Sequence, residues 1–241
     1  MSHASPAYSV AEEMQPSGIS VTKVSGFVPR PVVRPENLCF RRLHPRNFGP
    51  ADMVPLSEAY RCWSEVWKST LRELDGLPDV PSDEFTRQDE VCALFHGYEC
   101  IGMTCFRWVD ASVPMFRDDS YFKTWPSDAV ETACAFGPRI CILSNLTVAA
   151  PWRRAKGTSV MELLGALSVE RFLASDGDTL VGTPRRDRGV NKLCYRLGFR
   201  PVVEEVTHHG VLIDLVAFYQ RTSRRLSLSP QIEQLVTSLQ P

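Results

Sequence analysis

Apolar residues recur along this chain with two different spacings, which predict a mixture of helices and strands. The clearest helix is expected over residues 52–74, where six large apolar residues fall on one helical face and charged residues fall mainly on the others. Proline is tolerated in the first turn of a helix but not in its interior, so Pro55 places the start near Met53. The six apolar residues are Leu56, Tyr60, Trp63, Trp67, Leu71 and Leu74.

A strand, a loop and a helix are expected in succession from Ile140. Residues 140–148 form an apolar run of strand length, and Pro151 and Trp152 end it. Apolar residues return with helical spacing from Val160 onward. The connecting segment, called the basic loop (residues 153–159), carries Arg153, Arg154, Lys156, Gly157, Thr158 and Ser159.

The basic loop has the properties of an anion-binding site. A helix N-terminus presents backbone N–H groups without partners and the positive end of the helix dipole. Gly157 lets a ligand approach the backbone closely because it has no Cβ. The basic side chains add charge-assisted contacts to a phosphate. An ordinary connection with solvated charges is the alternative, since a single glycine is a weak phosphate signal.

Shorter elements complete the pattern. A helix is expected over residues 189–197, ended by Gly198, and two hairpins are expected around residues 96–99 and 208–210. Residues 110–137 are expected to be a long irregular connection, which is either a substrate lid or an insertion without a role. The remaining strands are expected over residues 37–43, 90–95, 100–109, 179–183, 202–206 and 211–219.

The chain is expected to hold one folded domain between two extensions. Residues 1–36 are rich in Ser and Pro and show no sustained period, so they are expected to be a disordered tail. Residues 37–220 contain all the expected strands. Residues 221–241 are expected to be a C-terminal tail or a short helix that begins near Pro230.

Composition and charge narrow the class of protein. The 241 residues carry a formal net charge of -1, which gives no overall attraction to nucleic acid. No apolar run approaches the roughly 18 residues that a membrane span needs, and the N-terminus lacks the pattern of a secretory signal. The 8 cysteines are scattered without metal-binding spacing. They suit reduced thiols in a cytoplasmic protein rather than disulfides or a metal site.

The loop sequence Arg154-x-x-Gly157-x-Ser159 resembles the Arg/Gln-x-x-Gly-x-Gly/Ala loop of the GNAT acyltransferase superfamily, with Ser159 in place of the usual Gly or Ala. In that family the loop follows the fourth strand and holds the pyrophosphate of acetyl-CoA or another acyl-CoA. The resemblance implies an α+β fold of three layers. In this α/β GNAT-like arrangement, a mixed, mostly antiparallel central sheet has helices on both faces.

A second stretch carries the same resemblance. The sequence NKLCYRLGF, from Asn191 to Phe199, is similar to the family's Asn-to-Gly-Phe helix, with a shorter spacing. It implies that Asn191 hydrogen-bonds the pantetheine arm and that a tyrosine four residues before the glycine protonates the departing thiolate. Cys194 occupies that position here and Tyr195 follows it. Both are therefore candidate general acids, and a packing or surface role is the alternative for Tyr195.

The resemblance also implies a reaction. An amine attacks the thioester of a bound acyl-CoA directly, with no covalent enzyme intermediate. The side chains and amides of the basic loop would hold the phosphates, and a backbone N–H of Leu146 or Val148 would polarise the thioester carbonyl. The ammonium must also lose a proton. Candidates for that task are His208, His209 and Asp214, with Ser144 or Asn145 positioning a water.

Several alternatives stay open. The sequence ILSNLTV resembles the Glu-x-Ser-Arg-x-x-Val strand of acyl-homoserine-lactone and long-chain N-acyl amino acid synthases, with Ile142 and Asn145 in place of the Glu and Arg. Those relatives draw on acyl carrier protein, which is thus an alternative donor and partner. Arg185, Arg186 and Arg188 would hold a donor phosphate, dock such a carrier or be solvated.

A non-catalytic GNAT-like module that binds an acyl thioester is the alternative to an enzyme. The aromatic stripe of residues 52–74 fits a core, its commoner role, or an acyl pocket, and the acceptor amine is not specified.

Overall fold

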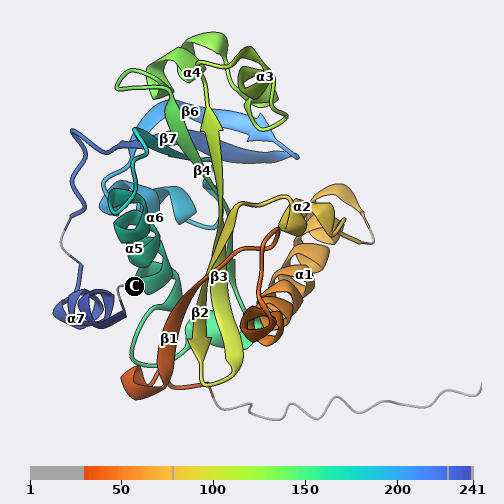
Figure 1. Ribbon diagram of the computed structural model, residues 1–241, viewed down its shortest axis with the longest axis vertical. Helices are drawn as coiled ribbons and strands as arrows, with labels where there is room; N and C mark the ends of the chain where they lie inside the picture. The colour runs from red at the N-terminus through yellow and green to blue at the C-terminus, as the bar shows by residue number, and fades with distance from the viewer. Residues whose placement is uncertain (1–29, 78, 227, 240–241) are drawn as a thin grey trace, which may run out of the picture.

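A seven-stranded mixed sheet forms the centre of the protein, which a computed structural model describes over residues 30–77, 79–226 and 228–239. The strands lie in the order β1-β2-β3-β4-β5-β7-β6, and every neighbouring pair is antiparallel except β4 and β5 (Figure 1). The bounds are β1 Leu38–Leu43, β2 Glu90–His96, β3 Glu99–Asp110, β4 Arg139–Val148, β5 Thr179–Gly182, β6 Arg200–His208 and β7 Val211–Tyr219.

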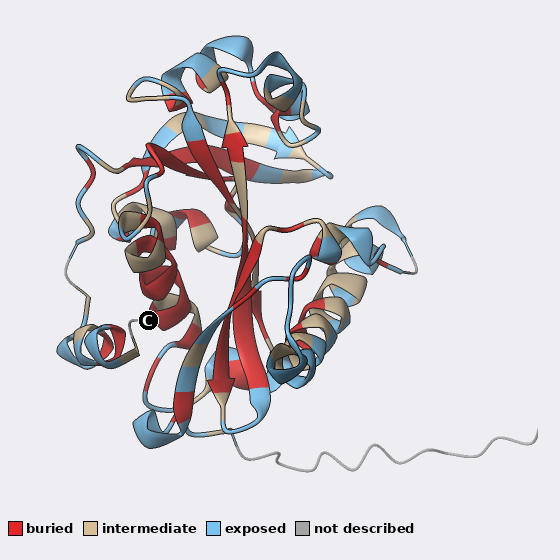
Figure 2. Cartoon of the chain, viewed as in Figure 1, coloured by how far each residue is buried: buried red, intermediate tan, exposed pale blue. Residues whose placement is uncertain are grey.

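Helices cover both faces of this sheet. α1 and α2 pack over the first strands, α4 packs over the last strands on the same face, and α5, α6 and α7 cover the opposite face. Figure 2 shows buried residues along the strands and on the sides of α1 and α5 that face them. The predicted α+β class with three layers is confirmed. The bounds are α1 Met53–Asp75, α2 Asp83–Thr86, α3 Pro114–Arg117, α4 Ser127–Ala133, α5 Val160–Leu173, α6 Val190–Arg196 and α7 Pro230–Leu239.

The amphipathic pattern of residues 52–74 forms α1, as predicted. Trp63 is only 1% exposed, and its ring centroid lies 5.7 Å from that of Tyr60. Trp67, one turn later, is half-buried and donates its indole N–H to Thr147 Oγ1 at 3.0 Å. The stripe therefore combines core packing with the lining of a cavity, which both tryptophans reach.

The prediction of an irregular connection over residues 110–137 was wrong in part. This segment holds α3, the 3-10 helix Phe122–Thr124 and α4. Helices of four, three and seven residues are too short to show a helical period in the sequence. Phe122 and Trp125 are buried against the last strands, so the segment covers that end of the sheet on the face of α1.

β4 and β5 diverge toward their C-terminal ends. They pair only from Ile140 to Ile142 of β4, although β4 continues to Val148. β4 stays paired with β3 beyond this point, but the register shifts near Asn145, whose φ is 55°. The sheet is therefore open between residues 143–148 of β4 and the end of β5.

The two extensions contact the domain where they are described. Residues 1–29 of the predicted N-terminal tail (1–36) lie outside the described residues. Further on, Val33 N–H donates to Lys156 O at 3.1 Å, and Lys156 N–H donates to Pro31 O at 2.9 Å. In the predicted C-terminal extension, residues 221–241, helix α7 packs against α5.

A membrane-spanning helix needs about 20 mostly apolar residues. None of the described helices is both long and apolar enough to cross a membrane.

Candidate functional site

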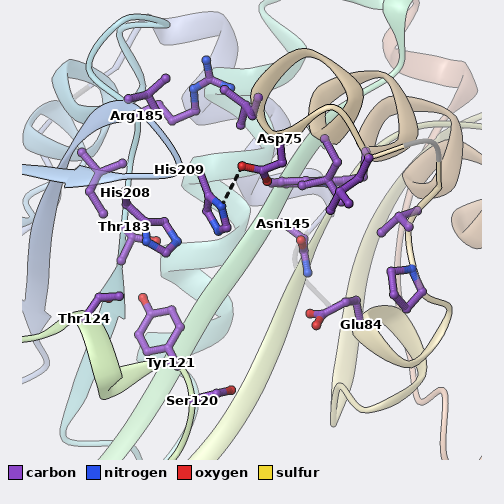
Figure 3. A pocket seen from close by; sticks show the side chains of 18 of the residues that line it. Asp75, Glu84, Ser120, Tyr121, Thr124, Asn145, Thr183, Arg185, His208 and His209 are labelled. Carbon is purple, nitrogen blue, oxygen red and sulfur yellow. Dashed lines mark hydrogen bonds and ion pairs between the residues drawn. The ribbon is translucent and has the colours of Figure 1, made fainter.

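Two adjoining cavities open where β4 and β5 diverge, and Figure 3 shows the residues that line the larger one. The α1-side cavity has a volume of about 490 Å³, and the α6-side cavity has a volume of about 340 Å³. They share eight lining residues, among them Trp67, Tyr121, Asn145 and His208. The two cavities therefore meet in one space between the strands.

Elements far apart in the sequence form the walls. α1 forms one side of the α1-side cavity, and the connection 110–137 forms another through Tyr121 and Thr124. The β6–β7 hairpin contributes a third side. The α6-side cavity lies between residues 142–146 of β4, the end of β5 and Cys194 of α6. The connection between β3 and β4 is therefore a wall of the site.

The basic loop follows β4 and leads into α5. The side chains of Arg153, Arg154 and Lys156 are exposed. Ser159 accepts a hydrogen bond from Glu162 N–H at 3.3 Å and so caps α5. A cap that satisfies one N–H leaves the other N–H groups of the first helical turn available to a ligand.

The loop backbone depends on Gly157, whose φ is 91°. Residues with a Cβ rarely adopt this conformation, whereas an added Cβ would meet no atom closer than 3.7 Å. Glycine is therefore required by the backbone conformation rather than by lack of space. Within the described residues, the N–H groups of Gly157, Thr158 and Ser159 donate to no protein acceptor. Such a group of free amides before a helix is suited to bind an anion.

The end of β4 presents its backbone toward the gap in the sheet. Leu146 lines the α6-side cavity. Ala149 N–H donates to Ile101 O of β3 at 3.0 Å. Since successive N–H groups of a strand point to opposite edges, those of Leu146 and Val148 point away from β3. Consistent with this direction, Val148 O accepts a hydrogen bond from Arg153 Nε at 3.1 Å.

Several solved structures, among them N-acetyltransferases and acyl-homoserine lactone synthases, have a similar fold. The mosquito arylalkylamine N-acetyltransferase like 5b has a TM-score of 0.55 and 10% identity, over 76% of this chain and 99% of that one. The CoA-dependent acyl-homoserine lactone synthase BjaI, with SAM and isopentyl-CoA, has a TM-score of 0.53 and 13% identity, over 85% of this chain and 90% of that one. The AHL synthase LasI has a TM-score of 0.51 and 15% identity, over 76% and 90%. The chain has the GNAT fold.

Sequence comparison adds nothing to this likeness. No protein-family model matches the chain, and no curated protein sequence matches it. At identities of 10–15% the likeness establishes the GNAT fold, and the chemistry must be argued from the residues of the site.

A buried carboxylate ties α6 to the last hairpin of this GNAT fold. Asp214 of β7 has a fully buried side chain. Its Oδ1 accepts hydrogen bonds from Arg186 Nη1 at 2.9 Å and Glu205 N–H at 3.0 Å. Its Oδ2 accepts them from Asn191 Nδ2 at 2.9 Å and Tyr195 OH at 2.6 Å. Burial acts to raise the pKa of Asp214, but these hydrogen bonds outweigh burial and hold the pKa below its usual value. With both oxygens occupied, this carboxylate is poorly placed to act as a base.

The Asp214 network also places the residues predicted on α6. Tyr195 donates its phenol proton to Asp214, and burial together with that carboxylate raises the pKa of Tyr195. Asn191 is buried, with its amide N–H on the same carboxylate. Cys194 lines the α6-side cavity, and burial raises the pKa of its thiol to about 12. Of these three predicted residues, Cys194 alone lines the cavity.

The tip of the β6–β7 hairpin places two histidines at the α1-side cavity. His208 lines both cavities, and burial, followed by the charge of neighbouring His209, lowers its pKa. The centroids of the His208 and His209 rings are 4.1 Å apart. His209 Nδ1 lies 3.0 Å from Asp75 Oδ1 at the end of α1 (Figure 3). Ser144 and Asn145 line the α6-side cavity opposite. Among the predicted proton acceptors, His208 therefore has the most suitable position.

Backbone conformation also distinguishes this site. In the described part of the chain, the non-glycine residues with positive φ are Asn145, Glu205 and His209, at 55°, 61° and 48°. Asn145 and His209 line the cavities, and Glu205 N–H donates to Asp214. Such conformations persist only where the surroundings hold them, and they concentrate at functional sites.

The arginines predicted for an outer phosphate or a carrier protein already have carboxylate partners. Arg185 forms two hydrogen bonds to Asp187, at 3.0 and 2.6 Å. Arg186 pairs with Asp214, and Arg188 pairs with Glu73 of α1 at 2.7 Å. These pairs connect the loop after β5 to α1 and β7 and reduce its availability to a phosphate.

Sequence reasoning missed four polar residues that line both cavities: Glu84, Arg87, Tyr121 and Thr183. Glu84 and Arg87 form an ion pair at the end of α2. The Tyr121 hydroxyl is buried and has no partner among the described residues. These residues belong to no motif, and the aromatic content of the connection 110–137 was the only signal for Tyr121.

Replacing Tyr195 with phenylalanine tests its role. Because Tyr195 donates to a buried carboxylate, the variant is expected to lose about 1.5 to 3 kcal/mol of unfolding free energy. For the acyl transfer that the resemblance implies, the rate is expected to change less than about threefold, against the 10²–10⁴-fold expected for a general acid. Tyr98→Phe is the matched control, since Tyr98 is 95% exposed. A loss of kcat beyond about tenfold without a change in stability would identify Tyr195 as the acid.

Proposed function

We propose that this protein is an N-acyltransferase that moves an acyl group from an acyl-CoA to an amine by direct attack in a ternary complex. The observation that carries the proposal is the position of the basic loop. It directly follows the β4 segment that lines the gap between β4 and β5. One strand thus leads from an anion-binding loop to a cavity able to enclose the attached thioester. The binding of isopentyl-CoA by BjaI, which has a similar fold, supports an acyl-CoA as the donor.

The basic loop would hold the donor phosphates. The amides of Gly157, Thr158 and Ser159 are free within the described residues, and the adjacent N-terminus of α5 favours negative charge. Arg154 and Lys156 are exposed beside these amides and can add charge-assisted contacts. Arg153 is partly engaged with Val148 O, which orients it along β4.

The end of β4 would receive the thioester. The N–H groups of Leu146 and Val148 point toward the edge from which β5 has diverged. A donor there places the thioester carbonyl within reach of a backbone N–H, which stabilises the oxyanion that forms on attack. Asn191, which the resemblance assigns to the pantetheine arm, lines neither cavity and donates its amide N–H to Asp214; its Oδ1 is buried without a partner in the described residues.

His208 would remove the proton from the attacking amine. A lowered pKa keeps this imidazole neutral at physiological pH, which is the state that accepts a proton. The departing thiolate needs a proton in return. Cys194 lines the cavity, but a thiol with a pKa of about 12 is a weak acid toward a thiolate. The Tyr195 proton is engaged by Asp214. Water or the protonated His208 is therefore the proton source that agrees best with the geometry.

Calorimetry and a thiol-release assay test the donor site. The protein is expected to bind CoA and acyl-CoA, and to release thiol when an amine is added. Gly157→Asp and Arg154→Ala are each expected to weaken binding about tenfold or more, because a charge-assisted hydrogen bond contributes about 1.5 to 3 kcal/mol.

Gly49→Asp is the control for Gly157→Asp, since Gly49 has an ordinary φ of -90° and open space around it. Acyl carrier protein loaded with an acyl chain is tested beside acyl-CoA, because the exposed arginines of the basic loop would also attract an acidic carrier. Absence of binding to CoA, acyl-CoA and loaded carrier would refute the proposal. Binding without turnover over a panel of amines would favour a non-catalytic module.

A further inference from the structure

The α1-side cavity is too large and too apolar for acetyl transfer to a small polar amine. Its volume of about 490 Å³ is within the range of cavities that enclose drug-sized ligands. The wall formed by α1 and the segment after it is almost entirely aromatic or aliphatic, and the β6–β7 hairpin adds two more apolar side chains. The apolar lining residues include Trp67, Leu71, Leu74, Val80, Val211 and Ile213.

The charged groups of this cavity already have partners. Asp75 Oδ1 lies 3.0 Å from His209 Nδ1, within hydrogen-bond distance, and Glu84 forms an ion pair with Arg87. Arg185 is engaged by a carboxylate of its own loop through two hydrogen bonds. The wall therefore offers no unpaired carboxylate to a polyamine or a lysine side chain. A charged ligand group buried there would lose its hydration without gaining an opposite charge.

We propose that the α1-side cavity binds an uncharged apolar group, an aliphatic chain or an aromatic ring, that is attached close to the reacting centre. This inference rests on the proposed acyl transfer and specifies its substrate class. The apolar group is carried either by the acyl part of the donor or by the body of the amine. Both meet at the junction of the two cavities, where His208 and Asn145 line the shared space.

The reaction defines where the apolar group must attach. The amine nitrogen attacks the thioester carbon, the C–N bond forms and the C–S bond breaks. The proton that the nitrogen loses passes to His208, and the thiolate leaves as a thiol after taking up one proton. The acyl chain continues from the attacked carbon and the amine substituent from the nitrogen, so either one can extend toward α1.

Two substrate series separate these sources. In the first, acetyl-, butanoyl-, octanoyl- and dodecanoyl-CoA are compared with one small amine. In the second, acetyl-CoA is the constant donor, and the amines compared are methylamine, butylamine, octylamine and phenethylamine. The kcat/KM is expected to rise about fourfold per methylene in one series until the cavity is full, from about 0.8 kcal/mol per buried methylene. A rise in the first series identifies the acyl chain, and a rise in the second identifies the amine. Flat series, or preference for a polyamine, would overturn the proposal.

A binding measurement separates this proposal from the acyltransferase itself. The uncharged fluorescent probe N-phenyl-1-naphthylamine is expected to bind the wild-type protein and to be weakened about tenfold or more by Leu74→Lys. Leu74 lines this cavity, is half-buried and belongs to none of the buried core clusters, so the lysine is tolerated by the fold. Leu212→Lys is the control, since Leu212 is 45% exposed and lines neither cavity.

Thr124→Trp is a second variant, which fills the cavity from an exposed position on the opposite wall. It is expected to reduce the advantage of the longer substrates at least fourfold and to leave CoA affinity unchanged. Thr237→Trp, at an exposed position of α7, is its control. Equal probe affinity in wild type and Leu74→Lys, or no affinity in either, would overturn the apolar site. Probe binding without any thiol release would keep the apolar site and refute the acyltransferase.

Discussion

Replacing Asp214 with alanine is expected to lower the free energy of unfolding by about 3 to 5 kcal/mol. The change leaves the buried donor of Asn191 and the half-buried donor of Tyr195 without their acceptor, and it removes one partner of Arg186. Unsatisfied buried donors cost the full desolvation of each group. The expected fall in Tm is roughly 6 to 20 °C, at about 2 to 4 °C per kcal/mol for a chain of this size.

Denaturant titration with Asp176→Ala as the control checks this prediction. Asp176 also pairs with an arginine, but its side chain is 85% exposed, and exposed pairs contribute at most about 1 kcal/mol. Because folding lowers the pKa of Asp214, its contribution is present above the pKa of the unfolded state and is lost as pH falls through the folded pKa. Equal stability of the two variants at neutral pH would show that the network does not hold α6 on the hairpin.

Replacing His208 with glutamine is expected to lower kcat/KM for acyl transfer by about 10² to 10⁴, the usual contribution of a general base. His208 lines the space shared by both cavities, as do Glu84, Arg87 and Arg185, but those charged groups are paired with other side chains. Glutamine keeps the size and polarity of the side chain and removes its ability to accept a proton. Donor affinity is expected to stay unchanged, since the basic loop does not line either cavity.

The pH dependence of kcat/KM tests His208 as a base, because a purely structural role would leave that dependence unchanged. Burial and His209 lower the pKa of His208, so the acidic limb of kcat/KM is expected below pH 6.5, with activity lost as pH falls through it. His209→Gln removes one of these causes and is expected to move the limb to higher pH. Loss of activity in His208→Gln of less than about threefold, with the acidic limb unchanged, would assign proton removal to an ordered water.

The sequence predicted the elements whose patterns are local. α1 was predictable because its apolar stripe repeats with a helical period over six turns, and Pro55 marks its start. The basic loop was predictable because Gly157 and the basic residues lie within seven positions between a strand and a helix. α3 and α4 were not predictable, since neither is long enough to repeat a pattern.

The site was only partly predictable. Cys194 and Leu146 line the α6-side cavity, and His208 lines both cavities, while their chemical roles stay predictions. The sequence could not predict that Tyr195 contacts Asp214, because this contact depends on how α6 packs against β7, nineteen residues later in the chain. It also could not predict that the ion pair of Glu84 and Arg87 lies at the cavity.

The amino-acid order by itself determined the succession of the strands and the longer helices and the glycine-containing basic loop before α5, because periodicity, helix capping and glycine conformation act over a few neighbouring residues. Tertiary structure alone decided the gap between β4 and β5, the two cavities, and the commitment of Tyr195 to Asp214. Each of these depends on strands and helices distant in the sequence meeting in one place. That packing decides which polar groups face a cavity and which form hydrogen bonds with a buried partner.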